Sequence, residues 1–219
     1  MKSIFLGAEL NGEHTLRDWH CSITNSDVIS MPSPNLSLLE VPGMSGRLDV
    51  SEALTGDVSY GNRTLKLELA KLTYVEDWYS VGLHVFNAFH GRKVKVIFDD
   101  DPDHYYLGRA VVSDPKRIRT AGTLTITVDA DPFRYNIQET VVPLTGQSEV
   151  IEAEIQNDRM PTIPTINVPN GCELIYEGVS YNLTAGDNVI PGCVFTEGTN
   201  EFTIRGAATA TVRFREGCL

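Results

Sequence analysis

Four carboxylates and a histidine within six residues form the densest group of potential metal ligands and acids in this sequence. In the stretch FDDDPDHYYLGRA, Asp99, Asp101 and Asp103 have the 1, 3, 5 spacing of an EF-hand calcium loop. Such a loop also needs glycine at its sixth position and glutamate at its twelfth, where this chain has His104 and Ala110. The flanking segments alternate as strands do. We therefore interpret the stretch as a turn between two strands, with weak calcium binding and acid catalysis as the alternatives.

Other catalytic patterns are missing from the sequence. It contains no G-x-S-x-G, no H-E-x-x-H, no phosphate-binding P-loop and no G-x-G-x-x-G. His20 and Cys21 are neighbours on an expected strand and would point to opposite faces. His84 and His90 are six residues apart on an expected helix and would not share a face. We predict that the protein is not an enzyme and needs no cofactor and no metal.

The cysteine spacing and the net charge argue against further classes of function for this chain, namely disulfide-linked or zinc-binding folds and nucleic-acid binding. The four cysteines contain no C-x-x-C pair, which favours reduced, mostly buried thiols. The net charge is −11: residues 1–136 hold 14 basic and 18 acidic side chains, whereas residues 137–219 hold four arginines, no lysine and 11 acidic side chains. An acidic surface repels nucleic acid. No apolar run is long enough for a membrane span, and no signal peptide is evident, so we expect synthesis in a cytoplasm and no membrane insertion.

Most of the chain has the alternating pattern of β-strands. Asn11-Gly12 lies between two such segments and predicts a hairpin with a type I′ turn. In RTLKLELAKL, Leu65, Leu67 and Leu69 would share one buried face. The Pro- and Gly-rich residues 31–50 predict a long loop around one short strand. Further strands are expected in KVKVIF, YYLGRAVVS and TLTITVDA, with Asp114-Pro115 and Ala121-Gly122 at the turns.

One segment has helical spacing instead. We predict an amphipathic helix over residues 74–90, and Gly91 is placed to cap its C-terminus. The apolar positions that support this prediction are Val75, Trp78, Leu83, Val85, Phe86 and Phe89.

The composition changes after Asp131-Pro132, where lysine disappears. Short strands separated by Gly, Pro and Asn follow one another, as in a compact β-sandwich. We predict a domain boundary near residues 136–140, giving domains 1–136 and 137–219. The expected strands of the second domain are ETVVPL, EVIEAEI, PTINV, CELIYEG, VSYNL, EFTIR and TATVRFR.

Several sequence segments, in their order along the chain, resemble segments of the distal tail proteins (Dit) of phages and prophages with long, non-contractile tails. Between residues 11 and 135 they are NGEHTLRDW, VPGMSGRLDVSEALTG, YGNRTLKLEL, FHGRKVKVIFDDDPDHYYLGRA and TVDADPFRY. The closing segments QNDRMPTIPTINV and GTNEFTIRGAATATVRFREGCL are similar to the end of that family. The resemblance covers nearly the whole chain.

The resemblance implies a mainly β protein. The first domain would be a ring-forming β-sandwich with one α-helix and a protruding hairpin, and the second a small galectin-like β-sandwich. It also implies a structural homohexamer at the virion tail tip, or baseplate. This ring would join the major tail tube protein and the tape-measure protein to a tail-associated lysin or fibre protein. It would also anchor receptor-binding proteins for host attachment. DNA would pass through its lumen without specific binding.

Six residues in the family-like phrases are our predicted interface residues: Trp19, Arg63, His90, Gly91, Tyr106 and Arg109. Arg63 and Arg109 could pair with carboxylates across a subunit boundary or within one subunit. The alternative function is a carbohydrate-binding module for adsorption to the host cell wall, carried by the second domain. That domain offers Tyr176, Tyr181 and a few phenylalanines, but no tryptophan, for stacking on sugars.

Overall fold

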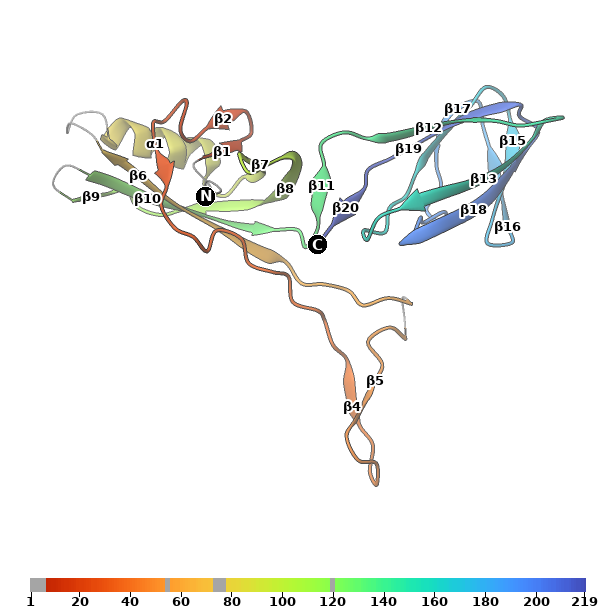
Figure 1. The fold of residues 1–219 in the computed structure, drawn as a ribbon, viewed down its shortest axis with the longest axis horizontal. Helices are drawn as coiled ribbons and strands as arrows, with labels where there is room; N and C mark the ends of the chain where they lie inside the picture. Colours follow the sequence, from red (N-terminus) through yellow and green to blue (C-terminus); the bar gives the residue numbers. More distant parts are fainter. Residues whose placement is uncertain (1–6, 54–55, 73–77, 119–120) are drawn as a thin grey trace. The chain divides into compact units, whose positions relative to one another are not determined.

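A computed structural model describes residues 7–53, 56–72, 78–118 and 121–219 of the chain. These residues form a mainly β protein with one helix, and the chain divides into two compact units, Met1–Arg134 and Tyr135–Leu219 (Figure 1). Among the described residues, no helix has the length and apolar character that crossing a membrane requires.

The first unit is built on a curled antiparallel sheet with the strand order β2-β1-β7-β8-β10-β6-β3, and β9 pairs with β10. Inward residues of these strands form one hydrophobic core, and helix α1 packs against it. The bounds are β1 Ala8–Leu10, β2 Glu13–His14, β3 Ser22–Ile23, β6 Arg63–Leu72, α1 Trp78–Phe89, β7 Lys93–Phe98, β8 Asp101–Val112, β9 Lys116–Ile118 and β10 Ala121–Ala130.

Local sequence patterns account for much of this sheet. The predicted turn at Asn11-Gly12 is confirmed, because both residues have positive φ (49° and 96°), as a type I′ turn requires. The leucines of β6, Leu65, Leu67 and Leu69, are buried as their alternation predicted. Two other details were wrong. Ala121-Gly122 lies within β10 rather than in a turn, and β9 was not predicted.

Helix α1 begins at Trp78 in the described part of the chain, and positions 74–77 of the predicted helix lie outside the described residues. Gly91 follows the helix with φ +74°, so the predicted C-terminal cap is confirmed. The predicted apolar face was partly wrong. Trp78, Val85 and Phe89 are buried, whereas Leu83 and Phe86 face solvent.

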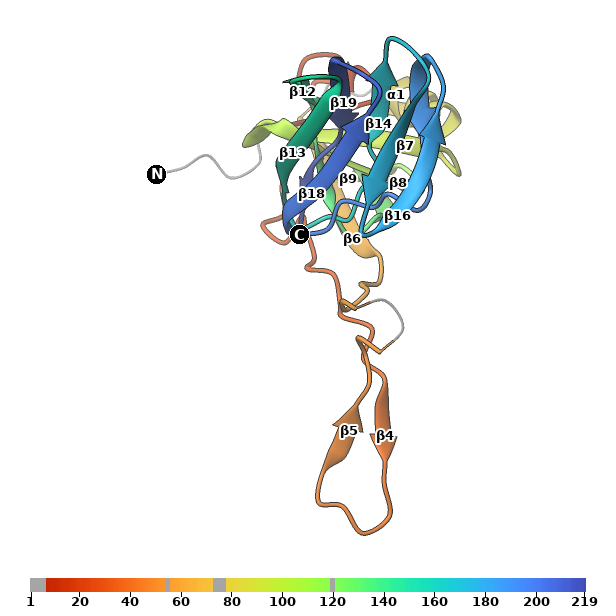
Figure 2. The ribbon, with the colours of Figure 1, turned by 90° about the vertical axis from the view of Figure 1, so that its right-hand side faces the viewer.

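Residues 31–50 contain two strands where we predicted one. β4 (Leu38–Glu40) pairs with β5 (Arg47–Asp49) and, among the described strands, with no other. Figure 1 and Figure 2 show these strands as a two-stranded arm with no further strand beside it. Gly43 and Gly46 lie between them with positive φ, which lets the chain reverse direction.

The second unit is a sandwich of two four-stranded antiparallel sheets, ordered β12-β19-β14-β17 and β13-β18-β15-β16. Residues from both sheets share one core, in which Phe195 packs against Phe202 and Phe214. Strand β17 was not predicted. The bounds of the eight sandwich strands are β12 Thr140–Thr145, β13 Val150–Asn157, β14 Thr165–Val168, β15 Cys172–Tyr176, β16 Val179–Leu183, β17 Gly186–Val189, β18 Gly198–Arg205 and β19 Thr209–Phe214. Two short strands outside the sandwich, β11 (Arg134–Asn136) and β20 (Gly217–Cys218), pair with one another.

Candidate functional site

The acidic stretch is a turn between β7 and β8, as its flanking strands predicted. Phe98 pairs with Asp101, so Asp99 and Asp100 form the turn itself. Asp99 accepts a hydrogen bond from Nε2 of His14 at 2.9 Å. Its carboxylate therefore links the turn to the neighbouring hairpin of β1 and β2.

Asp101 is held by two basic side chains. One of its carboxylate oxygens lies 2.6 Å from Nδ1 of His104, and the other accepts a hydrogen bond from Arg134 at 2.8 Å. In the described part of the chain, no group of three or more His, Cys, Asp or Glu side chains converges as metal ligands would. The described contacts of Asp101 are those of a structural ion-pair network.

Among the predicted interface residues, Trp19 is buried in its own unit. Its indole N–H donates to Glu13 at 2.9 Å, and its ring meets Phe89 edge to face at 5.4 Å. Trp19 thereby joins the segment after β2 to helix α1. Its interface role stays a prediction, and the side chain itself is only 3% exposed.

Arg63 and Tyr106 are buried together. The Arg63 guanidinium lies over the Tyr106 ring, 5.3 Å from its centroid, and donates a hydrogen bond to the carbonyl of Pro132. Tyr106 also packs edge to face against Phe98. These two contacts of Arg63 are with a backbone carbonyl and an aromatic ring of its own chain, so its pairing with a carboxylate, across a subunit boundary or within one subunit, stays a prediction. These side chains would support an interface through the strands that they position.

The other three predicted residues meet at the exposed C-terminal end of α1. Arg109 donates to the carbonyl of Gly91 at 2.5 Å, and Nδ1 of His90 accepts from the Val112 backbone at 3.2 Å. The imidazole of His90 stacks on Phe86, with ring centroids 4.4 Å apart. All of these side chains reach solvent, so this corner offers an aromatic and cationic surface to a partner.

Sequence reasoning missed two exposed apolar surfaces. The first is formed by Tyr79, Leu83 and Phe86 of α1, which are spaced i, i+4 and i+7 and therefore lie on one face of the helix. The second is the β4–β5 arm, where Leu39 and Leu48 face one another across the two strands and are 51% and 45% exposed. The sequence of a short apolar segment does not show whether its side chains are buried, because burial depends on which other segments pack against them. These two surfaces are therefore visible only in the tertiary structure.

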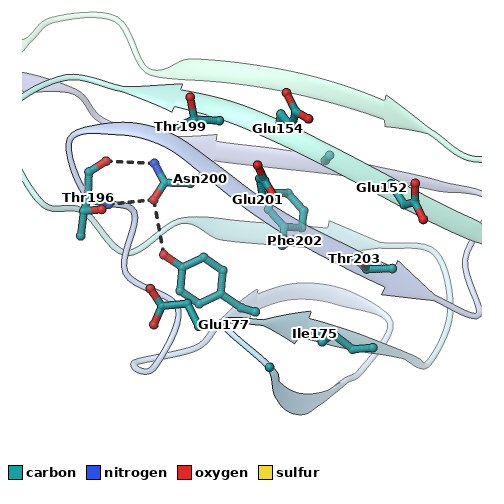
Figure 3. A pocket seen from close by; sticks show the side chains of 13 residues that line it. Glu152, Glu154, Ile175, Glu177, Thr196, Thr199, Asn200, Glu201, Phe202 and Thr203 are labelled. Atoms are coloured by element: carbon teal, nitrogen blue, oxygen red, sulfur yellow. Dashed lines mark hydrogen bonds between the residues drawn. The ribbon is translucent and has the colours of Figure 1, made fainter.

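The second unit has an open groove of about 850 Å³ on the sheet β13-β18-β15 (Figure 3). Its walls carry Glu152, Glu154 and Glu201, with Glu177 at one end. Along each strand these glutamates alternate with buried residues, so the sequence pattern could predict that they point outward. The sequence could not predict that they lie together on one sheet.

Two aromatic side chains of the second unit, Tyr176 and Phe202, lie beneath this groove and are buried. Tyr176 is buried, and its hydroxyl donates to the Val194 carbonyl at 2.6 Å, while Phe202 belongs to the core. Burial raises the pKa of Tyr176 to about 12, so its hydroxyl stays protonated. Neither ring forms a stacking surface for a sugar in this groove.

Comparison with known proteins gives consistent results. A family model described as a phage tail protein RIFT-related domain matches residues 19–130. Among solved structures, the crystal structure of the Dit protein (gp 19.1) of phage SPP1 is similar, with a TM-score of 0.70 and 14% sequence identity. The match covers 97% of this chain and 99% of that one, which is described as a paradigm of the hub adsorption apparatus in phages infecting Gram-positive bacteria. No curated protein matches the sequence significantly.

Proposed function

The chain belongs to the phage tail protein family with a RIFT-related domain, and from this premise we propose that it is a distal tail protein that closes into a homohexameric ring at the tail tip. It is a structural tail protein with a Dit-like fold. In the proposed role the first unit forms the ring, and the second unit, which we expect to be galectin-like, faces outward. No catalytic step is part of this role.

The observation that carries the proposal is the β4–β5 arm. Both strands are exposed along their whole length, and neither has a described strand beside it other than its partner in the arm. The arm nevertheless carries large apolar side chains, which water-exposed hairpins of monomeric proteins seldom gather. They are Leu36, Leu38, Leu39, Val41, Met44 and Leu48.

A closed ring requires two different, complementary surfaces on each subunit, because each interface is heterologous. The arm would be one of these surfaces. The exposed corner of His90, Gly91 and Arg109, continued by Phe86, would belong to the other. An apolar arm seated on an apolar and cationic corner buries surface that each isolated subunit leaves in water.

In the virion, the ring would connect the tube and tape-measure proteins to a lysin or fibre protein and would provide sites for receptor-binding proteins. DNA would pass through its lumen. The net charge of −11 supports passage without binding, since an acidic wall repels the phosphate backbone. Neutralising lumen carboxylates should then slow DNA ejection more than neutralising external ones, and an equal effect would contradict this part of the proposal.

Native mass spectrometry of the purified chain, alone and with the fibre or lysin protein of the same phage, tests the ring. We expect a species of six copies. A strict monomer at high concentration that stays monomeric when the tail partner is added would overturn the proposal. Electron microscopy of the assembly should show six-fold symmetry.

A further inference from the structure

Asn-Gly pairs are sites at which asparagine readily loses its side-chain amide. Glycine has no side chain, so its backbone nitrogen can reach the carbonyl carbon of the asparagine side chain that precedes it. This sequence contains two such pairs, Asn11-Gly12 and Asn170-Gly171. All four residues are exposed, and in the described part of the chain neither glycine amide donates a backbone hydrogen bond. The main difference between the pairs is how the fold holds the asparagine side chain.

The Asn11 side chain is fixed at both of its polar atoms. Its Oδ1 accepts a hydrogen bond from the Lys95 amide at 2.8 Å, and its Nδ2 donates to the Lys93 carbonyl at 3.3 Å. Both partners lie on β7, and the Lys95 carbonyl also accepts from the Asn11 amide at 3.0 Å. Attack by Gly12 would pull the side-chain carbonyl away from β7 and leave the Lys95 amide without this acceptor, which costs free energy.

The Asn170 side chain, in the loop between β14 and β15, is fixed only through Nδ2. This atom donates to the carbonyls of Gly206 at 2.6 Å and of Gly171 at 3.1 Å, whereas Oδ1 accepts no hydrogen bond from the described residues. The second bond holds the side-chain amide against the backbone of Gly171, whose nitrogen must attack. The side-chain carbonyl can therefore turn towards that nitrogen without giving up a hydrogen bond at Oδ1.

We propose that Asn170-Gly171 is a self-modification site, at which water converts the asparagine into aspartate or isoaspartate. The identical pair Asn11-Gly12 is protected by the fold. In the reaction the Gly171 nitrogen forms a bond to Cγ of Asn170 and gives up its proton, and Nδ2 leaves as ammonia. Water then opens the resulting succinimide at one of its two carbonyl carbons, so the conversion needs no oxidant, reductant or cofactor. The inference does not rest on the proposed homohexamer, because it concerns a loop of the second unit alone.

The modification also changes the end of the sandwich at which it occurs. Aspartate and isoaspartate have no Nδ2, so the carbonyls of Gly171 and Gly206 lose this donor and face a negative charge instead. Gly206 has φ +93° in the turn between β18 and β19. Asn170→Asp, which imitates one product, should therefore melt at a lower temperature than the wild type. An unchanged melting temperature would overturn this consequence of the modification.

Incubation of the full chain at mildly alkaline pH, followed by peptide mass spectrometry with electron-transfer fragmentation, tests the inference. This method distinguishes asparagine, aspartate and isoaspartate at each position. In the folded protein we expect Asn170 to be converted about tenfold faster than Asn11, because Asn11 must first give up an additional hydrogen bond. In denaturant the two pairs should react at the same rate, since their dipeptide sequence is the same.

Gly171→Ala is the matched variant, because the added methyl group hinders attack on Asn170 and would have only the Leu183 carbonyl near it, at 3.7 Å. It should slow conversion at Asn170 and leave the rate at Asn11 unchanged. Equal rates at the two positions of the folded wild type, or faster conversion of Asn11, would overturn the inference. Unequal rates in denaturant would do the same, since neighbouring residues rather than the fold would then cause the difference.

Discussion

His14 and Asp99 are joined by a hydrogen bond, although 85 residues separate them in the sequence. Nε2 of His14 lies 2.9 Å from the Asp99 carboxylate, while Nδ1 accepts from the backbone amides of Leu16 and Arg17 at 3.1 and 3.2 Å. Because Nδ1 is an acceptor, the proton must be on Nε2. One buried imidazole therefore ties the end of β2 to the acidic turn.

Replacing His14 with alanine should lower the free energy of unfolding by about 1–3 kcal/mol, because two part-buried hydrogen bonds from backbone amides and one to a carboxylate are lost with the buried imidazole. Urea denaturation measures this change. His20→Asn is the matched control, since His20 is exposed and asparagine tolerates its φ of 55°. NMR of the wild-type imidazole should show the Nε2–H tautomer, and an Nδ1–H tautomer would contradict the assignment.

Gly122→Ala should destabilise the first unit by about 1–3 kcal/mol, because the added Cβ would overlap the indole of Trp78 and push α1 from the sheet. The control is Gly61→Ala, where the nearest atom would be 3.7 Å from the new Cβ. We expect the control to unfold within about 0.5 kcal/mol of the wild type. Equal unfolding curves for the two variants would argue against this packing.

The four thiols should react at different rates. Burial raises the pKa of Cys21 and of Cys193 to about 11, so at pH 8 only about a thousandth of each is the reactive thiolate. Iodoacetamide labelling followed by mass spectrometry should modify the half-buried Cys172 and Cys218 first. In denaturant all four should react alike, and early labelling of Cys21 in the folded protein would contradict its burial.

The raised pKa values of Cys21 and Cys193 also predict a loss of stability at alkaline pH. Unfolding returns each pKa from about 11 towards 9.0, so between these values the unfolded chain binds fewer protons than the folded one. The free energy of unfolding should therefore fall as pH rises from about 9 to 11. The double variant Cys21→Ala/Cys193→Ala should show a shallower fall over this range, and identical slopes would remove the thiols as its cause.

Leu39→Asp/Leu48→Asp should abolish the ring without unfolding the subunit, since both side chains are exposed in the isolated chain. Native mass spectrometry should give monomers, while the circular dichroism spectrum and melting temperature stay close to those of the wild type. Val141→Asp, at a similarly exposed position of β12, should leave the ring intact. A ring that persists in the double variant would exclude the arm as an interface.

Local patterns predicted those elements whose cause is local. Asn11-Gly12 forms its turn because these two residue types accept positive φ, and Leu65, Leu67 and Leu69 share a face because a strand has period two. The turn at the acidic stretch has an equally local cause, since it consists of Asp99 and Asp100 and aspartate favours turns, whereas Pro102 lies in β8. The order of family-like phrases pointed to the phage tail family before any contact was known.

The sequence by itself therefore determined the β-rich character, the single helix, the turn at the acidic stretch and the family. Only the tertiary structure decided which apolar residues are covered. Leu83 and Phe86 fit the same helix pattern as Val85 and Phe89 but face solvent. It also gathered Glu154 and Glu201, 47 positions apart, into one groove. The reason is physical: periodicity fixes the direction of a side chain on its own element, whereas burial depends on what a distant segment places against it.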